Sequence, residues 1–145
     1  MIDEFLNTQR ITDAIARSYF GQGDGVLREF KLKNRRRVDL VIINDKGWII
    51  IIEIKSSPED FLSDKKWGEY IDWADQFYFG VAQNFPIEVL PKEHGIIITD
   101  GFDTYEARPS PVQKLNSSRR NTLVRKIARA SMRRVEYERN DLIGI

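Results

Sequence analysis

The chain has 145 residues, a formal net charge of +1 at pH 7 and no cysteine, which excludes disulfides, thiolate-bound zinc and a cysteine nucleophile. Its 41% hydrophobic and 31% charged residues are typical of a globular protein, and its length predicts one domain over residues 1–145. The longest apolar run, residues 48–52, is too short to cross a bilayer, and the acidic, polar N-terminus is not that of a signal peptide. We therefore expect a cytoplasmic protein with no membrane partner.

Charge is distributed unevenly along the chain. Residues 31–37 include five basic side chains in seven, and residues 116–145 carry eight basic against three acidic side chains. Between residues 53 and 75 the balance reverses, with seven acids against three lysines. Basic patches on a nearly neutral protein favour a polyanionic partner, although solvated helix faces produce the same pattern.

Apolar periodicity predicts strands interleaved with helices. An amphipathic pattern predicts a first helix over residues 3–20, which the glycine-rich residues 21–25 end. A second helix is predicted to start at Pro58, with Ser57 as N-cap and a buried stripe from Phe61 and Leu62 to Ala74. The other predicted elements are strands over residues 26–32, 76–82, 95–99 and 102–107, a two-stranded hairpin over residues 37–55, and a last, basic helix over residues 118–138. This order predicts an α/β fold with an αβββαβ core, a mixed central sheet flanked by helices and a C-terminal basic helix.

Three charged residues interrupt the apolar hairpin, and charge inside a buried strand is costly unless it is paired or binds a metal. A three-residue loop closed by Gly47 would place Asp39 directly opposite Glu53, with Lys55 on the same face. A two-residue loop would put the two carboxylates on opposite faces. The first register predicts a site for a hard cation such as Mg²⁺ or Mn²⁺. The alternative is an exposed hairpin with ordinary surface charges.

Glu29 is a candidate third acid of this site. If the loop before the hairpin spans three residues, Glu29 lies opposite Asp39 on the neighbouring strand. The alternative is an exposed strand residue, and the sequence leaves both open.

The pattern Asp39…Glu53-Ile54-Lys55 on neighbouring strands resembles the PD-(D/E)XK (restriction-endonuclease-like) nuclease superfamily, whose core has the order αβββαβ. Val38 stands where the superfamily name has proline. A resemblance through nearly the whole chain is to the MmcB family of small nuclease-like proteins associated with bacterial DNA repair. It is carried by the segments ITDAIAR, RRVDLVII, EIKSSPEDFLSDKKWGEY and DQFYFGVAQNFP and by the arginine-rich last helix.

These resemblances imply a restriction-endonuclease-like fold and a DNA-repair context. They imply that Asp39, Glu53 and the Ile54 backbone carbonyl hold Mg²⁺ or Mn²⁺, and that Lys55 orients water or stabilises negative charge. Salt-sensitive phosphate contacts are expected from these basic residues: Arg35, Arg36, Arg37, Lys65, Lys66, Arg119 and Arg120. Trp67 and Tyr70 match marked positions of the family, but their periodicity favours a core role.

The function predicted is that of a metal-dependent DNA endonuclease acting in repair, by phosphodiester hydrolysis. Two alternatives stay open: a non-catalytic DNA-binding module with the same fold, and a partner-binding protein in a complex with other repair proteins. The single histidine, His94, excludes a His-rich zinc site. The sequence leaves the oligomeric state open.

Overall fold

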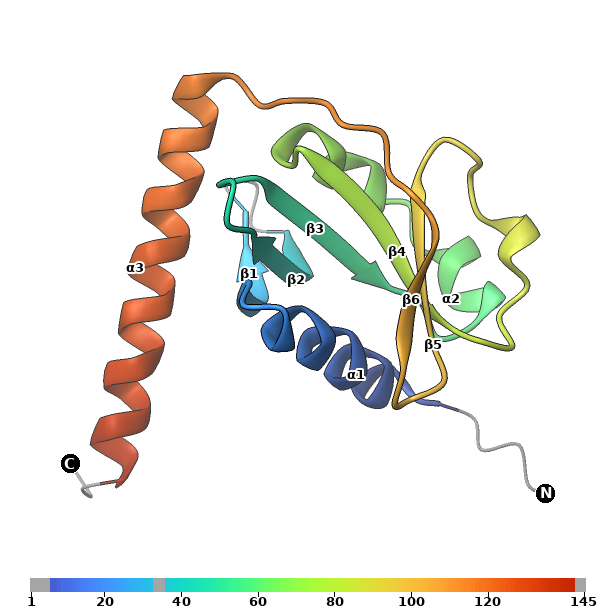
Figure 1. Ribbon diagram of the computed structural model, residues 1–145, viewed down its shortest axis with the longest axis horizontal. Helices are drawn as coiled ribbons and strands as arrows, with labels where there is room; N and C mark the ends of the chain where they lie inside the picture. The colour runs from blue at the N-terminus through green and yellow to red at the C-terminus, as the bar shows by residue number, and fades with distance from the viewer. Residues whose placement is uncertain (1–5, 33–35, 143–145) are drawn as a thin grey trace. The chain divides into compact units, whose positions relative to one another are not determined.

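The computed structural model describes residues 6–32 and 36–142. The elements in chain order are α1 (Thr8–Gly21), β1 (Gly25–Lys31), β2 (Arg37–Ile43), β3 (Ile49–Ile54), α2 (Pro58–Ser63), the 3₁₀ helix η1 (Trp67–Trp73), β4 (Gln76–Ala82), the 3₁₀ helix η2 (Ile87–Val89), β5 (Gly95–Thr99), β6 (Thr104–Arg108) and α3 (Ser117–Leu142) (Figure 1). They form two compact units, residues 1–114 and 115–145, and each is described by itself. One domain over residues 1–145 stays a prediction. None of the described helices is long and apolar enough to cross a membrane.

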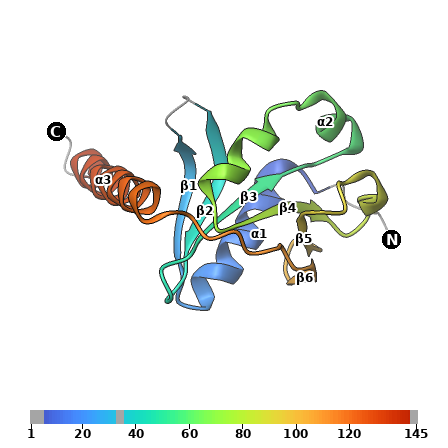
Figure 2. The ribbon, with the colours of Figure 1, turned by 90° about the horizontal axis from the view of Figure 1, so that it is seen from above.

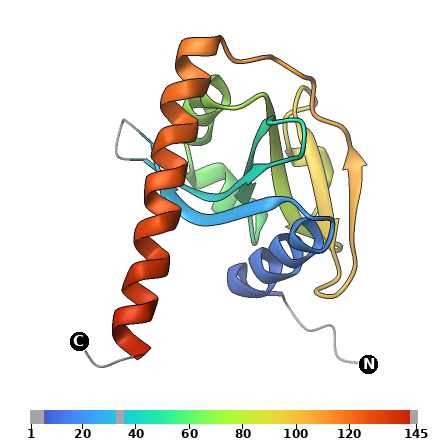
Figure 3. The same cartoon turned by 60° about the vertical axis from the view of Figure 1, so that its left-hand side comes forward.

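The first unit is built on one six-stranded mixed sheet with the strand order β1-β2-β3-β4-β5-β6. β1, β2 and β3 form an antiparallel meander, β3, β4 and β5 run parallel, and β6 returns antiparallel beside β5 (Figure 3, β6 in orange and β5 in yellow). Two adjacent parallel strands need a crossover connection, and the one from β3 to β4 contains α2 and η1. The predicted α/β fold with a mixed central sheet is therefore confirmed.

Both faces of the central strands are covered. α1 lies on one face of the sheet, whereas α2 and η1 lie on the other (Figure 2). On the first face, Ile11 and Ile15 of α1 join one apolar cluster with residues of β2 and β3, namely Leu40, Ile42, Ile50, Ile52 and Ile54. On the second face, Phe61 and Trp67 pack edge-on against Phe79, with ring centroids 5.5 and 5.1 Å apart. All six residues of β3 are consequently buried, which explains its continuous apolar sequence.

The core role expected for Trp67 and Tyr70 agrees with their surroundings. Trp67 is half-buried among aromatic rings, and the Tyr70 side chain is buried with its hydroxyl 3.4 Å from the Arg37 carbonyl oxygen. Burial raises the pKa of Tyr70 to about 12, so its hydroxyl stays protonated at neutral pH.

The prediction of one continuous helix from Pro58 to Ala74 is wrong for its second half. Ser57 caps α2 as expected, because its Oγ accepts a hydrogen bond from the Asp60 amide at 3.1 Å. The helix nevertheless ends at Ser63, and helical turns resume only in η1. Leu62, expected in the buried stripe, is 66% exposed.

Asp64 is the physical reason for this break. Its backbone is extended, with φ −88° and ψ 114°. Its carboxylate bonds to the Lys55 ammonium and to the Lys66 amide. An aspartate that satisfies nearby donors in this way competes with continuation of the helix.

The other boundaries differ from the prediction by a few residues. α1 begins at Thr8, because the Asn7 side chain accepts a hydrogen bond from the Arg10 amide at 2.9 Å and caps the helix there. Residues 3–5 of the predicted helix lie outside the described residues. β6 covers Thr104–Arg108 rather than residues 102–107, and α3 extends the predicted last helix at both ends.

Gly95 offers a test of the packing at the start of β5. A Cβ atom added there would overlap the Tyr78 ring and lie 2.8 Å from the Ser110 nitrogen. Because neither group can move aside easily, we expect Gly95→Ala to lower the free energy of unfolding by about 1–3 kcal/mol. Denaturant titrations followed by the fluorescence of the three tryptophans measure this quantity. Gly68→Ala, where an added Cβ meets nothing within 4 Å, is the matched control. Equal stability of the two variants would contradict the packing described.

Candidate metal centre

The hairpin of β2 and β3 has the register that brings Asp39 next to Glu53. Gly47 has φ +80°, its amide donates to the Asn44 carbonyl oxygen at 2.9 Å, and the Asn44 amide donates to the Trp48 oxygen at 3.2 Å. These bonds define the predicted three-residue loop, in which glycine takes the left-handed position. The paired residues run from Ile43↔Ile49 to Leu40↔Ile52. The predicted register is confirmed, and its next position is Asp39 opposite Glu53.

The strand pairing stops where the two carboxyl groups begin. Leu40↔Ile52 is the last Cα pair of β2 and β3. Beyond it, the Ile54 amide donates to Oδ2 of Asp39 at 2.8 Å. The Ile54 amide thus bonds to the Asp39 side chain instead of to the backbone of β2. This bond fixes the half-buried Asp39 carboxylate against β3.

Glu53 is a buried carboxyl group beside a second acid. The residue is 6% exposed, the Asp39 carboxyl lies beside it, and its Oε1 is the one buried side-chain polar atom without a hydrogen-bond partner in the described part of the chain. Burial, reinforced by the hydrogen bond and charge of Asp39, raises the pKa of Glu53 far above its usual range, and the opposing effect of Lys55 is smaller. Because this raised pKa, about 10, lies above neutral pH, we infer that the Glu53 carboxyl keeps its proton at pH 7 when no metal is bound.

Lys55 lies on the same face and pairs with Asp64. Its Nζ is 2.5 Å from Oδ2 of Asp64, and the two side chains are 5% and 18% exposed. The second oxygen, Oδ1, accepts a hydrogen bond from the Lys66 amide at 2.8 Å. Burial acts to raise the pKa of Asp64, but the hydrogen bonds from Lys55 and the Lys66 amide outweigh it and lower the pKa. The pair is therefore charged on both sides.

Sequence reasoning did not identify Asp64. The residue lies nine positions after Lys55, inside a stretch whose pattern favoured one continuous helix. A buried lysine followed by an acid where a helix could end is the signal that would have pointed to it.

Glu29 has the predicted register but does not join the pair. Arg28↔Leu40 and Phe30↔Val38 flank the position opposite Asp39, yet Glu29 itself has φ +50°, which non-glycine residues rarely adopt. Its side chain is 66% exposed and lies 4.0 Å from Nη1 of Arg37. Among residues 6–32 and 36–142, no three Asp, Glu, His or Cys side chains are grouped to hold a metal ion. The structure thus favours the exposed-strand alternative for Glu29.

The arginines at the start of β2 have acidic neighbours. Nε of Arg36 lies 2.8 Å from Oε2 of Glu69, and Arg37 lies near Glu29 as described above. Arg35 lies outside the described residues. Arg37 is exposed at the start of β2, two residues before Asp39, so it lies close to the carboxyl pair along the chain.

The other predicted DNA-binding residues lie in two places. Lys65 and Lys66 are exposed and directly follow Asp64, so they flank the carboxyl site. Arg119 and Arg120 lie in the first turn of α3, in the second unit. Their contribution to the same binding surface stays a prediction.

The oxygen atoms of Asp39 and Glu53 suit a hard divalent cation. Mg²⁺ and Mn²⁺ prefer carboxylate oxygens, and Mg²⁺ is commonly bound by one or two carboxylates with water and phosphate in the other positions. The orphaned Oε1 of Glu53 supports this fit, because a buried oxygen without a partner costs free energy that a bound cation would offset. The Ile54 carbonyl as a further ligand stays a prediction.

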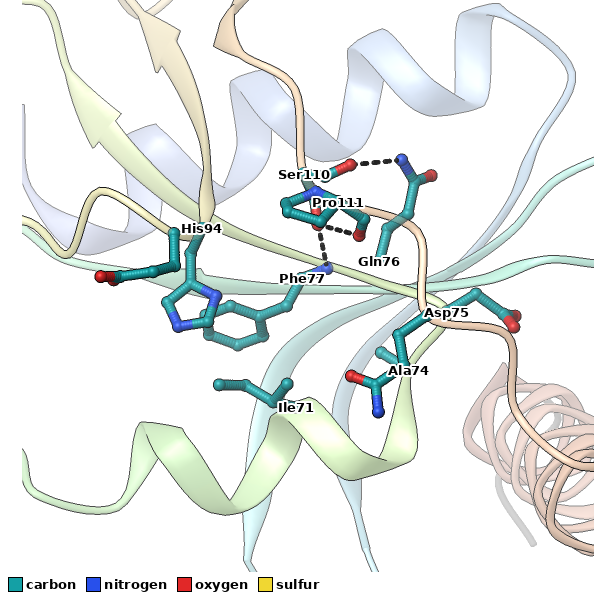
Figure 4. A pocket seen from close by; sticks show the side chains of 10 residues that line it. Ile71, Ala74, Asp75, Gln76, Phe77, His94, Ser110 and Pro111 are labelled. Carbon is teal, nitrogen blue, oxygen red and sulfur yellow. Dashed lines mark hydrogen bonds between the residues drawn. The ribbon is translucent and has the colours of Figure 1, made fainter.

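A separate cavity of about 160 Å³ lies near His94 (Figure 4). It is lined by residues of η1 and β4 and of the segments before β5 and after β6, among them Ile71 and Ser110. The Ser110 hydroxyl accepts a hydrogen bond from the Phe77 amide at 3.0 Å, and the rings of His94 and Phe77 have centroids 5.7 Å apart. Burial lowers the pKa of His94, so its imidazole is neutral at pH 7. Neither acid of the carboxyl pair lines this cavity.

Fold and site together define an α/β protein with a mixed sheet and a buried carboxyl pair at the end of a hairpin. The family model described as "DNA repair protein MmcB-like" matches residues 5–141, and the chain belongs to this family. A solved structure, the SPO1766 protein of unknown function from Silicibacter pomeroyi, is similar over 95% of this chain and 94% of its own, with 36% identity and a TM-score of 0.87. A comparison with curated proteins gave no match. The predicted membership of the MmcB family is confirmed.

The raised pKa of Glu53 predicts how pH affects the metal-free protein. Above about pH 4.3 the unfolded state has released the Glu53 proton, whereas the folded state keeps it until the higher folded pKa is passed. This group therefore makes folding less favourable as pH rises through that window. Glu53→Gln carries no ionisable group, so its free energy of unfolding relative to wild type should increase between about pH 5 and pH 8, by at least about 1 kcal/mol.

Urea titrations in the presence of a chelator measure this difference. The comparison uses the difference between variant and wild type because His94 also titrates in this range. Glu138→Gln, an exposed acid of α3, is the control and should follow wild type at every pH. A difference between Glu53→Gln and wild type that stays constant with pH would contradict the protonated carboxyl pair.

Proposed function

We propose that the protein is a Mg²⁺- or Mn²⁺-dependent deoxyribonuclease of the PD-(D/E)XK (restriction-endonuclease-like) superfamily that acts in DNA repair. The observation that carries this proposal is the buried Glu53 carboxyl beside Asp39, with Lys55 on the same face of the sheet. The element order from α1 to β4 supports the superfamily assignment. The description of the family as DNA repair proteins supports DNA as the substrate.

The carboxyl pair would hold the metal and orient the attacking water. A divalent ion held by Asp39 and Glu53 would polarise the phosphate and acidify a bound water. Asp39 is the more accessible of the two acids, and its Oδ2 is fixed by the Ile54 amide. Its carboxylate would accept a hydrogen bond from the water that attacks phosphorus.

Lys55 would supply a fixed positive charge for the transition state. Hydrolysis of a phosphodiester increases the negative charge around phosphorus, and a charge that is already oriented stabilises it without reorganisation. The Lys55 ammonium is buried and held by Asp64, so its position changes little during the reaction.

Exposed basic residues around this site would hold the phosphates on either side of the bond that is cut. Lys65 and Lys66 are exposed and follow Asp64 in the chain, and Arg37 is exposed two residues before Asp39. Such contacts are independent of sequence and release counterions from DNA, which makes binding sensitive to salt.

The test of the proposed activity is cleavage of duplex, single-stranded, flap and branched DNA with Mg²⁺ or Mn²⁺. We expect hydrolysis of at least one of these substrates, abolished by a chelator. Asp39→Asn and Lys55→Ala should lower the rate by at least about 100-fold, because each removes a charge that acts on the reacting phosphate. Glu138→Gln is the control with unchanged rate.

The outcomes separate the three candidate functions. Salt-sensitive DNA binding without cleavage of any substrate would favour the non-catalytic DNA-binding module. No DNA binding even at low salt would favour a protein that binds other repair proteins. Cleavage by Asp39→Asn at the wild-type rate would show that the proposed site is wrong.

The two lysines after Asp64 predict a salt-dependent contribution to DNA affinity. Replacing Lys65 and Lys66 together by alanine should weaken binding of all DNA sequences alike, and should reduce the slope of log K against log salt by about 1–2. Fluorescence anisotropy at several salt concentrations measures both quantities. Lys92→Ala, an exposed lysine before β5, is the control. An unchanged slope for the double variant would place the DNA elsewhere.

A further inference from the structure

The geometry points to Asp64 as a positioning residue of the carboxyl site: by pairing with the Lys55 ammonium, it keeps the Glu53 carboxyl available to a divalent cation. This inference rests on the proposed function, since it concerns what sets the metal affinity of the same site. It assigns a role to an acid that the resemblance to nuclease families does not mark.

The first step is that Lys55 lies within reach of Glu53. The two residues are two positions apart along the direction of β3, so their Cα atoms are about 7 Å apart and their side chains leave the same face of the sheet. A lysine side chain with four methylene groups can span this distance. The ammonium nevertheless bonds to Asp64 at 2.5 Å, and Oε1 of Glu53 has no hydrogen-bond partner.

The second step is that this ammonium needs an anionic partner. The Lys55 side chain is 5% exposed, and a buried charge that loses its counterion is strongly destabilised. If Asp64 were neutral, the acids remaining on that face of the hairpin would be Asp39 and Glu53. Lys55 would then turn to them, and a divalent cation would have to displace it.

The third step is that the chain is built to hold the Asp64 carboxylate in place. Its Oδ1 accepts the Lys66 amide at 2.8 Å, while the Asp64 amide lies 3.2 Å from the carbonyl oxygens of Asp60 and Phe61. Asparagine can keep these bonds, because its side-chain oxygen accepts the same amide. Asp64→Asn therefore removes the charge that holds Lys55 and leaves the local backbone interactions intact.

The experiment is a double-mutant cycle in which calorimetry measures the affinity of the metal-free protein for Mn²⁺. Asp64→Asn should weaken Mn²⁺ binding by about 10–100-fold, the range usual for residues that orient metal ligands. Lys55→Met should bind Mn²⁺ at least as tightly as wild type. In the Lys55→Met background, Asp64→Asn should change the affinity by less than about threefold, because its effect acts through Lys55. Asp64→Glu, which keeps the charge, should recover part of the affinity.

Two controls separate this role from a loss of folding. Glu59→Gln removes an exposed negative charge from α2, so it reports the effect of charge alone and should change Mn²⁺ affinity by less than about threefold. Tryptophan fluorescence during urea titration shows whether each variant is folded at the temperature of the binding measurement.

Each outcome decides the inference. Equal Mn²⁺ affinity of Asp64→Asn and wild type overturns it while leaving the metal site in place. The inference is also overturned if Asp64→Asn lowers Mn²⁺ affinity equally in the wild-type and Lys55→Met backgrounds, because Asp64 would then act on the metal directly. Failure of wild type to bind Mn²⁺ overturns both this inference and the proposed metal site. If the Mn²⁺ affinities follow the predicted pattern but no DNA is cleaved, the role of Asp64 is supported. Only the proposed nuclease activity is then contradicted.

Discussion

The buried carboxyl group of Glu53 is the constraint on which the first unit depends. Glu53 lies on a strand covered on both faces, where an isolated charge is costly. Asp39 is the acid beside it, and the pairing of β2 with β3 ends just before the two acids. The proposed divalent cation would stabilise both carboxylates in place of the Glu53 proton. The arrangement therefore supports the metal site that we propose.

A second pair of charges links the site to the fold around it. Asp64 forms an ion pair with the buried Lys55 ammonium, and the same residue ends α2. The chain then re-enters a helical turn as η1, which carries Trp67 onto Phe79, the neighbour of Glu53 on β4. A single acid therefore shapes the connection from β3 to β4 and determines which charges remain near the carboxyl pair. A substitution that also removes the acceptor of the Lys66 amide would disturb local structure, whereas Asp64→Asn changes only the charge.

Features that depend on local chemistry could be predicted from the sequence. Features that depend on contacts between residues far apart in the fold could not. The hairpin register followed from the glycine of a short turn, because one extra loop residue would have reversed the face of Asp39. The break after α2 could not be predicted, since it depends on a tertiary contact between Lys55 and Asp64. The left-handed backbone of Glu29 was also missed, because composition and alternation do not reveal strain. Spacing alone suggested that Glu53 meets a second acid, but its raised pKa comes mainly from burial, which depends on the tertiary packing around it.

The most direct test of the central claim is to locate a bound paramagnetic ion by NMR. Substoichiometric Mn²⁺ broadens the amide signals of nearby residues first, so the pattern of broadening reports the site. We expect the amide signals of Asp39, Glu53 and Lys55 to disappear at the lowest Mn²⁺ concentrations in wild type and to survive in Asp39→Asn. Broadening that begins at other acids, such as Asp24 and Asp45 near the hairpin turn, would contradict a metal site at the carboxyl pair.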